Sequence, residues 1–173
     1  MTDEPTPPRT PDPTAGEPHV LTDLVERWET VVEDAEAMAA EYAEDGWETL
    51  VLHPGDVTPM PPANLPDATD RVGFDVLVPG SEFDLLSEWV ADADFDRYDV
   101  YRAKEKGVIF AVSAVEAPES EQVVLVPLYY GVEKVMETSK KAREQGELRL
   151  YVRPLEYDEH VELVQSEPSV LFP

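Results

Sequence analysis

The chain has 173 residues, of which 38 are acidic and 13 basic, so its formal net charge is −25. Apolar residues still make up 42% of the sequence, which excludes wholesale disorder. Repulsion among so many carboxylates is relieved in molar salt, where the Debye length falls to about 3 Å. We therefore expect a salt-adapted protein; the alternative is an acidic protein that binds a basic partner.

Cysteine is absent, which excludes a disulfide framework, a thiolate metal site and a cysteine nucleophile. No apolar run approaches the ~18 residues of a membrane span, and the first residues lack the pattern of a signal peptide. These features predict a cytoplasmic protein with no membrane partner.

The composition of the chain changes sharply after residue 19. Residues 1–19 contain six prolines and almost nothing apolar, so we expect a disordered tail there and a single globular domain over 20–173. From Leu21 onward apolar residues recur at helical spacing as far as Tyr42. Thr22 is the expected N-cap of this helix and Gly46 its expected C′ residue.

The next segment predicts two strands and a helix. Residues 47–53 and 74–78 have strand patterns, and the proline-rich segment 54–71 between them is expected to be a loop. Ser81 and Asp84 resemble a capping box at the start of the following helix.

Three consecutive strands are predicted next. Residues 97–104 and 108–116 flank Gly107, which indicates a hairpin, and residues 123–130 form the third strand. Pro127 within that strand implies a bulge or a sheet edge.

The last part of the sequence predicts a helix, a strand and a helix. The helix runs from Val132 to about Arg143 and closes at Gly146, the strand covers 148–153, and a short helix is expected over 157–164. Because consecutive strands favour antiparallel pairing, we predict an α+β fold. Its mainly antiparallel mixed sheet has about six strands, packed with three to four helices.

Several familiar sites are excluded. The eight glycines are never closer than seven residues, so neither a dinucleotide-binding loop nor a phosphate-binding P-loop can form. No GxSxG motif is present, and only His53 and His160 could act as bases in the ordered part. We predict no cofactor.

Three aspartates at alternate positions, Asp92, Asp94 and Asp96, resemble the start of a calcium loop. The pattern then fails, because Arg97 stands where the turn needs glycine and Ala103 where the ion needs glutamate. The triplet is better interpreted as solvated acidic surface.

The first candidate site surrounds the end of the first strand. His53 and Asp56 lie at a strand end and a tight turn, and Asp75 joins them if its strand pairs with the first. These residues would serve as catalytic groups or metal ligands of a metal-assisted hydrolase or lyase. The alternative is structural: Pro54 and Gly55 form the turn, Asp56 caps it and His53 is partly buried.

The second candidate is a basic stretch between Gly131 and Arg153, which contains six basic and four acidic residues. Its best positions are Lys141, Arg149 and Arg153, and such a patch could bind a phosphate, a carboxylate or a nucleic-acid backbone. Three further bases complete it: Lys134, Lys140 and Arg143. The alternative is ordinary helix chemistry, with cations opposing the helix dipole and Glu137 pairing with Lys141.

The third candidate is a set of tyrosines on predicted strands, which could form a face for a ligand or a protein partner. They are Tyr98, Tyr101, Tyr129, Tyr130 and Tyr151. The alternative is half-buried sheet residues whose hydroxyls have hydrogen-bond partners.

A family resemblance adds to this interpretation. The run AEDGWETLVLHPGDVT, followed by GFDVLVP, DVYRA, LYYGV and YVRPL, resembles a family of small acidic haloarchaeal proteins of unknown function. The resemblance covers about residues 22–165. It implies a salt-loving origin and one domain, and it implies no activity, cofactor or site.

The leading hypothesis is a non-enzymatic cytoplasmic module that binds a protein partner or a small ligand. The metal-assisted enzyme and the anion- or nucleic-acid-binding protein remain as alternatives. Nucleic acid is disfavoured as a partner because binding through counterion release weakens in molar salt. The sequence leaves the oligomeric state open.

Overall fold

The computed structural model describes residues 17–62, 64–156 and 158–172. The chain divides into two compact units, Met1–Thr30 and Val31–Pro173. The described part of the first unit is the beginning of helix α1 (Glu17–Glu44). Most of the expected tail, residues 1–16, lies outside the described residues, whereas 17–19 are helical.

Helix α1 confirms one predicted end and corrects the other. It begins at Glu17, so Thr22 lies inside the helix and the predicted N-cap is wrong. At the other end Gly46 adopts φ +89°, and its N–H donates to the Ala43 carbonyl at 3.0 Å. The N–H of Trp47 donates to the Tyr42 carbonyl, which completes a Schellman motif with Gly46 at C′, as predicted.

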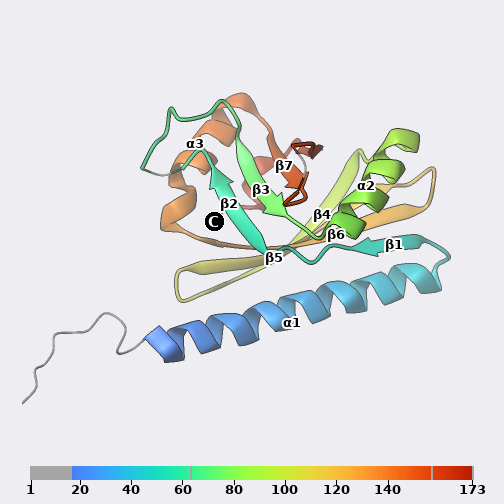
Figure 1. The fold of residues 1–173 in the computed structure, drawn as a ribbon, viewed down its shortest axis with the longest axis horizontal. Coiled ribbons are helices and arrows are strands. Elements are labelled where there is room, and N and C mark those ends of the chain that lie inside the picture. The colour runs from blue at the N-terminus through green and yellow to red at the C-terminus, as the bar shows by residue number, and fades with distance from the viewer. Residues whose placement is uncertain (1–16, 63, 157, 173) are drawn as a thin grey trace, which may run out of the picture. The chain divides into compact units, whose positions relative to one another are not determined.

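The second unit contains two sheets of four strands each (Figure 1). Sheet A has the strand order β1 (Glu48–Val51), β6 (Gln122–Gly131), β5 (Val108–Ala117), β4 (Arg97–Glu105). Sheet B has the order β2 (Asp56–Met60), β3 (Gly73–Leu77), β7 (Leu148–Arg153), β8 (Val161–Gln165). Each sheet is mixed: β1 runs parallel to β6 and β3 parallel to β7, and the other pairs are antiparallel.

The helices of the second unit lie before, between and after these strands. Besides the C-terminal part of α1 they are α2 (Gly80–Asp92), the 3₁₀ turn η1 (Glu133–Val135), α3 (Met136–Gln145) and the 3₁₀ turn η2 (Pro168–Val170). The α+β class is therefore confirmed, with eight strands in two sheets among the described residues. No helix in the described part of the chain is long and apolar enough to cross a membrane.

Three local predictions are wrong. Strand β2 occupies part of the predicted loop 54–71, and strand β8 occupies part of the predicted helix 157–164. The capping box does not form, because Ser81 lies inside α2 and makes no cap. Instead, the carbonyl of Pro79 accepts hydrogen bonds from the N–H groups of Glu82 and Phe83, each at 3.1 Å.

The predictions for the hairpin and for Pro127 are confirmed. Strands β4 and β5 are joined by Lys106 and Gly107, whose positive φ angles of 52° and 80° are those of a type I′ turn. Pro127 lies beyond the last β6 residue paired with β1, so the strand has a neighbour on one side there.

The two sheets enclose the main core. Inward side chains of sheet B, such as Phe74, Val76 and Leu150, are fully buried together with Ile109 and Val124 of sheet A. The opposite face of sheet A bears Glu116, which contacts Tyr42 of α1. The part of α1 within the second unit therefore lies on that face, and its own buried positions are Val31, Ala35 and Ala39.

Candidate functional site

His53 lies on the link between β1 and β2, and it joins two helices. Its backbone N–H donates to Glu82 of α2 at 2.7 Å, and its Nδ1 lies 2.7 Å from the second Glu82 oxygen. Its Nε2 lies 3.3 Å from Glu36 of α1. Partial burial lowers the pKa of His53, but the two carboxylates outweigh it and raise the pKa above its usual value of 6.5. The ring therefore lies between two acidic side chains that favour its protonated form.

Asp56 and Asp75 lie on sheet B and interact with other partners. Asp56 begins β2, and its carboxylate accepts a hydrogen bond from Thr58 at 2.8 Å. Asp75 pairs in register with Thr58, and both of its oxygens accept from Nε of Arg153, at 2.9 and 3.0 Å. Among the described residues, no group of three or more His, Asp or Glu side chains could hold a metal ion.

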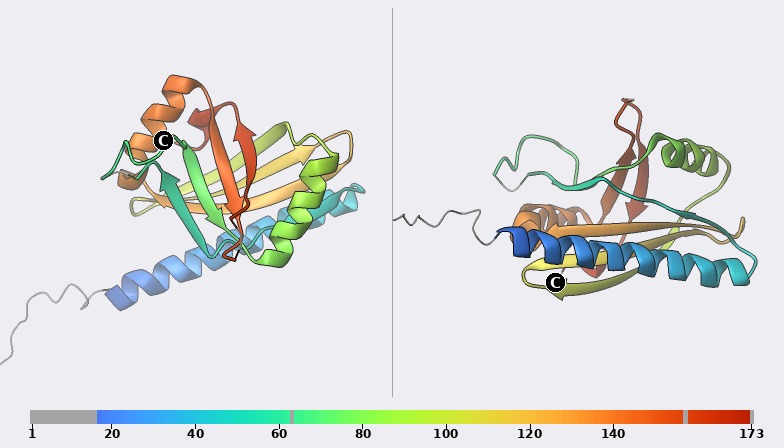
Figure 2. Two further views of the ribbon diagram at one scale, coloured as in Figure 1. Left: turned by 45° about the horizontal axis from the view of Figure 1, so that its top comes forward. Right: turned by 60° about the horizontal axis from the view of Figure 1, so that its bottom comes forward.

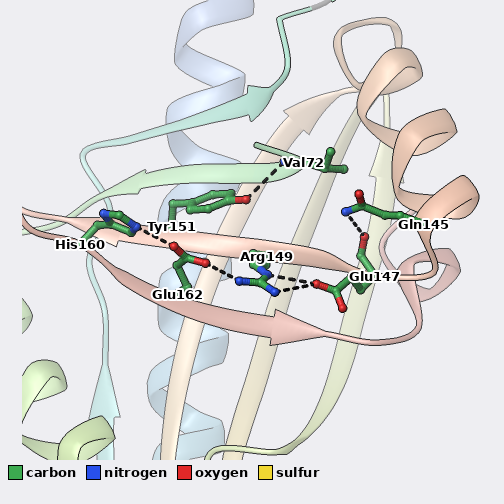
Figure 3. Close-up of polar contacts among 7 residues, drawn as sticks. All are labelled: Val72, Gln145, Glu147, Arg149, Tyr151, His160 and Glu162. Carbon is green, nitrogen blue, oxygen red and sulfur yellow. Dashed lines mark hydrogen bonds and ion pairs between the residues drawn. The ribbon is translucent and has the colours of Figure 1, made fainter. Parts of the chain in front are cut away.

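The three best cations of the basic stretch each lie beside an acid or a carbonyl. Arg149 contacts Glu162 through Nη1 at 2.6 Å and Glu147 through Nε and Nη2 at 3.0 Å (Figure 3). Arg153 bonds to Asp75 as described above. Lys141 donates to the Pro66 carbonyl at 2.6 Å. These positions therefore do not converge on one shared pocket.

Around Arg149 the outer face of sheet B carries a chain of polar contacts, with a separate hydrogen bond at Tyr151 beside it (Figure 3). Nε2 of His160 lies 2.8 Å from Glu162, and the pKa of Glu162 is lowered, first by Arg149 and then by His160. The Tyr151 hydroxyl accepts a hydrogen bond from the Val72 N–H at 3.3 Å, and Tyr151 is 6% exposed. The ring of Tyr151 also lies 6.0 Å from that of His160.

The predicted tyrosine face does not form as one surface. Tyr98 accepts a hydrogen bond from the Glu167 N–H at 2.5 Å, and Tyr130 donates to the Leu171 carbonyl in the core. Tyr129 is partly buried, and burial raises its pKa. Tyr101 differs from all of these, because it is 55% exposed.

Two of the hollows on the described surface are a cleft beside the acidic triplet and a groove beside α3, and the groove is partly lined by basic residues of the second candidate. A cleft of about 310 Å³ is lined by the acidic triplet at 92, 94 and 96 and by the β5–β6 turn. A more apolar groove of about 480 Å³ follows α3, where Met136, Lys140, Arg143 and Phe172 line it.

The feature that sequence reasoning missed is the edge formed by β4. Among the described residues, the strand pairs with β5 alone, and Figure 2 shows it at the outer side of sheet A (left panel, yellow-green). From Tyr101 to Glu105 every residue is exposed, so both faces of this half of the strand contact solvent. The signal was present in the sequence: Arg102, Lys104 and Glu105 place charges on both faces, which an internal strand would not tolerate.

The comparisons with known proteins give a family and no activity. A model described as a family of unknown function, DUF7529, matches residues 19–173. The chain belongs to this family. Comparison with curated proteins and with solved structures found no significant match. Membership of a family of unknown function is therefore confirmed, and a haloarchaeal origin stays a prediction.

Proposed function

We propose that this DUF7529 protein is a non-catalytic protein-interaction module that binds an extended segment of a partner along the edge of β4. The observation that carries the proposal is the nine-residue strand β4, which has a neighbouring strand on one side only within the part of the chain that the structure describes. Edge strands present a row of backbone N–H and C=O groups, and a partner strand can pair with them.

A comparison of the sheet edges favours β4. The other three edge strands are β1, β2 and β8, with four, five and five residues, and β2 also contains Pro59. Short strands and proline are devices that protect an edge from pairing. Strand β4 is longer than each of them and has no proline.

The local charge indicates which partner is compatible. Residues 97–106 carry four of the 13 basic side chains against two acids, in a chain whose net charge is −25. An acidic segment, or one of mixed charge with a small net charge, can therefore approach this edge without the strong repulsion that acidic segments meet elsewhere on the protein.

The two alternatives have less support. Metal-assisted hydrolysis by His53, Asp56 and Asp75 needs these groups around one ion, yet His53 bonds to Glu36 and Glu82 while Asp75 bonds to Arg153. Anion binding through Arg149 and Arg153 needs these guanidinium groups to exchange a carboxylate for the ligand.

A displayed library of random peptides of about ten residues, the length that matches β4, tests the proposal. The protein is immobilised at low density so that copies cannot meet. Selected peptides should lose at least about tenfold in affinity on the double change Tyr101→Lys and Ala103→Lys, which adds charges along the edge.

Val164→Lys is the matched control, since Val164 is an exposed residue of another edge strand, β8. Peptides that bind the natural protein, the double variant and Val164→Lys equally would place binding on a different surface. A library that yields no binders would contradict the proposal of a protein-interaction module.

We also infer that the protein works in a salt-rich cytoplasm. The net charge of −25 supports this, because salt screens the repulsion between carboxylates. The unfolding midpoint should rise steadily between about 0.1 and about 3 M KCl. An unchanged or falling midpoint would contradict the inference.

A further inference from the structure

The sequence of β4 is compatible with pairing to itself. We propose that the partner strand is β4 of a second copy of this chain, antiparallel to the first and related to it by a two-fold axis at Tyr101. The inference rests on the proposed function, because it names the partner of the same edge.

The centre of the strand defines the register. Tyr101 is the middle residue of Arg97–Glu105, so an axis at this position pairs all nine residues of both copies. A two-fold interface uses the same surface patch of each subunit, and an antiparallel pair of identical strands satisfies that requirement. The two exposed Tyr101 rings then lie opposite one another, and aromatic cross-strand pairs stabilise sheets.

The side chains brought opposite each other in this register are compatible. Arg97, which bonds to Glu116 within its own copy, faces Glu105 of the second copy, and the symmetry places these opposite charges beside each other twice. On the same side Asp99 faces Ala103. On the other side, Tyr98 faces Lys104, where the aliphatic stem can cover the ring.

Neighbouring registers place like charges opposite each other or leave strand residues unpaired. Axes at Asp99 or Arg102 place identical charges directly opposite each other, and an axis at Ala103 places Arg102 opposite Lys104. An axis at Val100 avoids like charges but leaves the last two residues of the strand, Lys104 and Glu105, without strand partners. The register centred on Tyr101 is therefore the longest without a repulsive pair.

Salt controls the association. Each copy carries −25 overall, whereas β4 itself carries three bases and two acids. Repulsion between the two bodies acts over the Debye length, about 10 Å at 0.1 M and about 3 Å at 1 M salt. The backbone hydrogen bonds of the paired strands are largely unaffected by screening, so the dimer forms more strongly as salt rises.

A single-cysteine crosslink tests the register directly, because the natural chain contains no cysteine. Residues directly opposite in an antiparallel pair have Cα atoms about 4.5–5.5 Å apart, within the range of a disulfide. Tyr101→Cys should therefore give a covalent dimer under mild oxidation in about 2 M KCl.

Ala103→Cys is the matched control. In the proposed register its two copies are displaced by four residues, about 13 Å along the strands, which is too far for a disulfide. Position 101 should crosslink at least about tenfold faster than position 103. Equal rates at the two positions would indicate random collision and would overturn the proposal.

The mass in solution gives an independent readout. Light scattering should find a mass near 19.4 kDa at low salt and twice that value in concentrated KCl. Glu105→Arg should lower the dimer fraction, since it places cations opposite Arg97. Glu119→Arg makes the same charge change at an exposed turn between β5 and β6 and should leave the fraction unchanged.

The two proposals fail separately. A protein that stays monomeric at every salt concentration, and that crosslinks equally at 101 and 103, overturns self-pairing. If the peptides of the display experiment still require the β4 edge, the proposed function survives with a different partner. If those peptides ignore the edge while position 101 crosslinks selectively, the strand serves self-association and the binding module is wrong.

Discussion

The outer face of sheet B and the edge strand β4 of sheet A are both rich in charge, and they use it differently. On sheet B, Arg153 bonds to Asp75, and Arg149 bonds to Glu147 and Glu162. On β4, Arg97 likewise bonds to Glu116 of β5, but the exposed half of the strand, Tyr101 to Glu105, carries charges on both of its faces.

The difference shows how position in a sheet decides the role of a charge. Across paired strands, opposite charges at adjacent positions can bind each other and stabilise the pairing. On an edge strand the same residue types restrict which other strand can approach. Perturbing sheet B should therefore affect stability, whereas perturbing the exposed part of β4 should affect association.

The largest effect should come from Gly73→Ala on sheet B. Gly73 has φ +146°, and an added Cβ would lie 1.8 Å from the carbonyl oxygen of Arg149 on β7. Strain of this kind, together with the displacement of a paired strand, should cost about 3 kcal/mol or more in the free energy of unfolding by urea.

Gly80→Ala is the control for that change, because a Cβ at Gly80 meets nothing within 4 Å. It should be neutral or slightly stabilising. A loss below about 1 kcal/mol for Gly73→Ala would mean that β3 and β7 are less closely packed than the structure indicates.

Asp75→Asn should have the next largest effect. The carboxylate is 11% exposed and accepts two contacts from Arg153 Nε, so neutralising it weakens a charge-assisted interaction in a partly buried position. We expect a loss of about 2 kcal/mol in urea unfolding.

Asp99→Asn makes the same chemical change on exposed β4 and should stay within about 0.5 kcal/mol of the natural protein. Equal effects at the two positions would remove the contrast between the two regions.

Local sequence signals predicted the parts of the fold that depend on neighbours in the chain. Gly46 and the Lys106–Gly107 turn are positions where positive φ is required, and glycine accepts it without strain. The strand β8 was missed although Val161, Leu163 and Gln165 are its buried alternate residues, because a short segment of this kind also fits a helical spacing. In β2, Pro59 suggested a loop, yet proline is tolerated on an edge strand.

The division into two sheets and the contacts of the candidate site depend on long-range pairing. Strand β1 pairs with β6, and Arg153 contacts Asp75 across 78 positions of sequence. No periodicity or spacing within either segment specifies such a partner. For the same reason, the contacts of His53 with Glu36 and Glu82 were not predictable, and its candidate role as a catalytic group or metal ligand stays a prediction.

A smaller effect is expected at His53, which lies on the link between the two sheets. Because the carboxylates of Glu82 and Glu36 raise its pKa, the stability they contribute is complete below pH 6.5 and is lost as pH rises through the higher pKa of the folded state. His53 is 45% exposed, so the loss should stay below about 1 kcal/mol.

The measurement is urea unfolding from pH 5.5 to pH 9 for the natural protein and for His53→Gln, with the pH range chosen to span the usual histidine pKa of about 6.5. The difference between the two should shrink as pH rises. A constant difference across this range would show that the charge on His53 contributes nothing.

The smallest change in the free energy of unfolding should come from Tyr101→Phe. Tyr98→Phe, on the same strand, is the variant with which it is compared. Tyr98 accepts a hydrogen bond from the Glu167 backbone N–H, so removing its hydroxyl should cost about 1 kcal/mol. Tyr101 is largely exposed, and its change should stay within about 0.5 kcal/mol in dilute protein, where copies do not meet. A larger loss at Tyr101 than at Tyr98 would mean that the edge of β4 contributes to the stability of the fold. The proposal that this edge is a binding surface would then lose its structural basis.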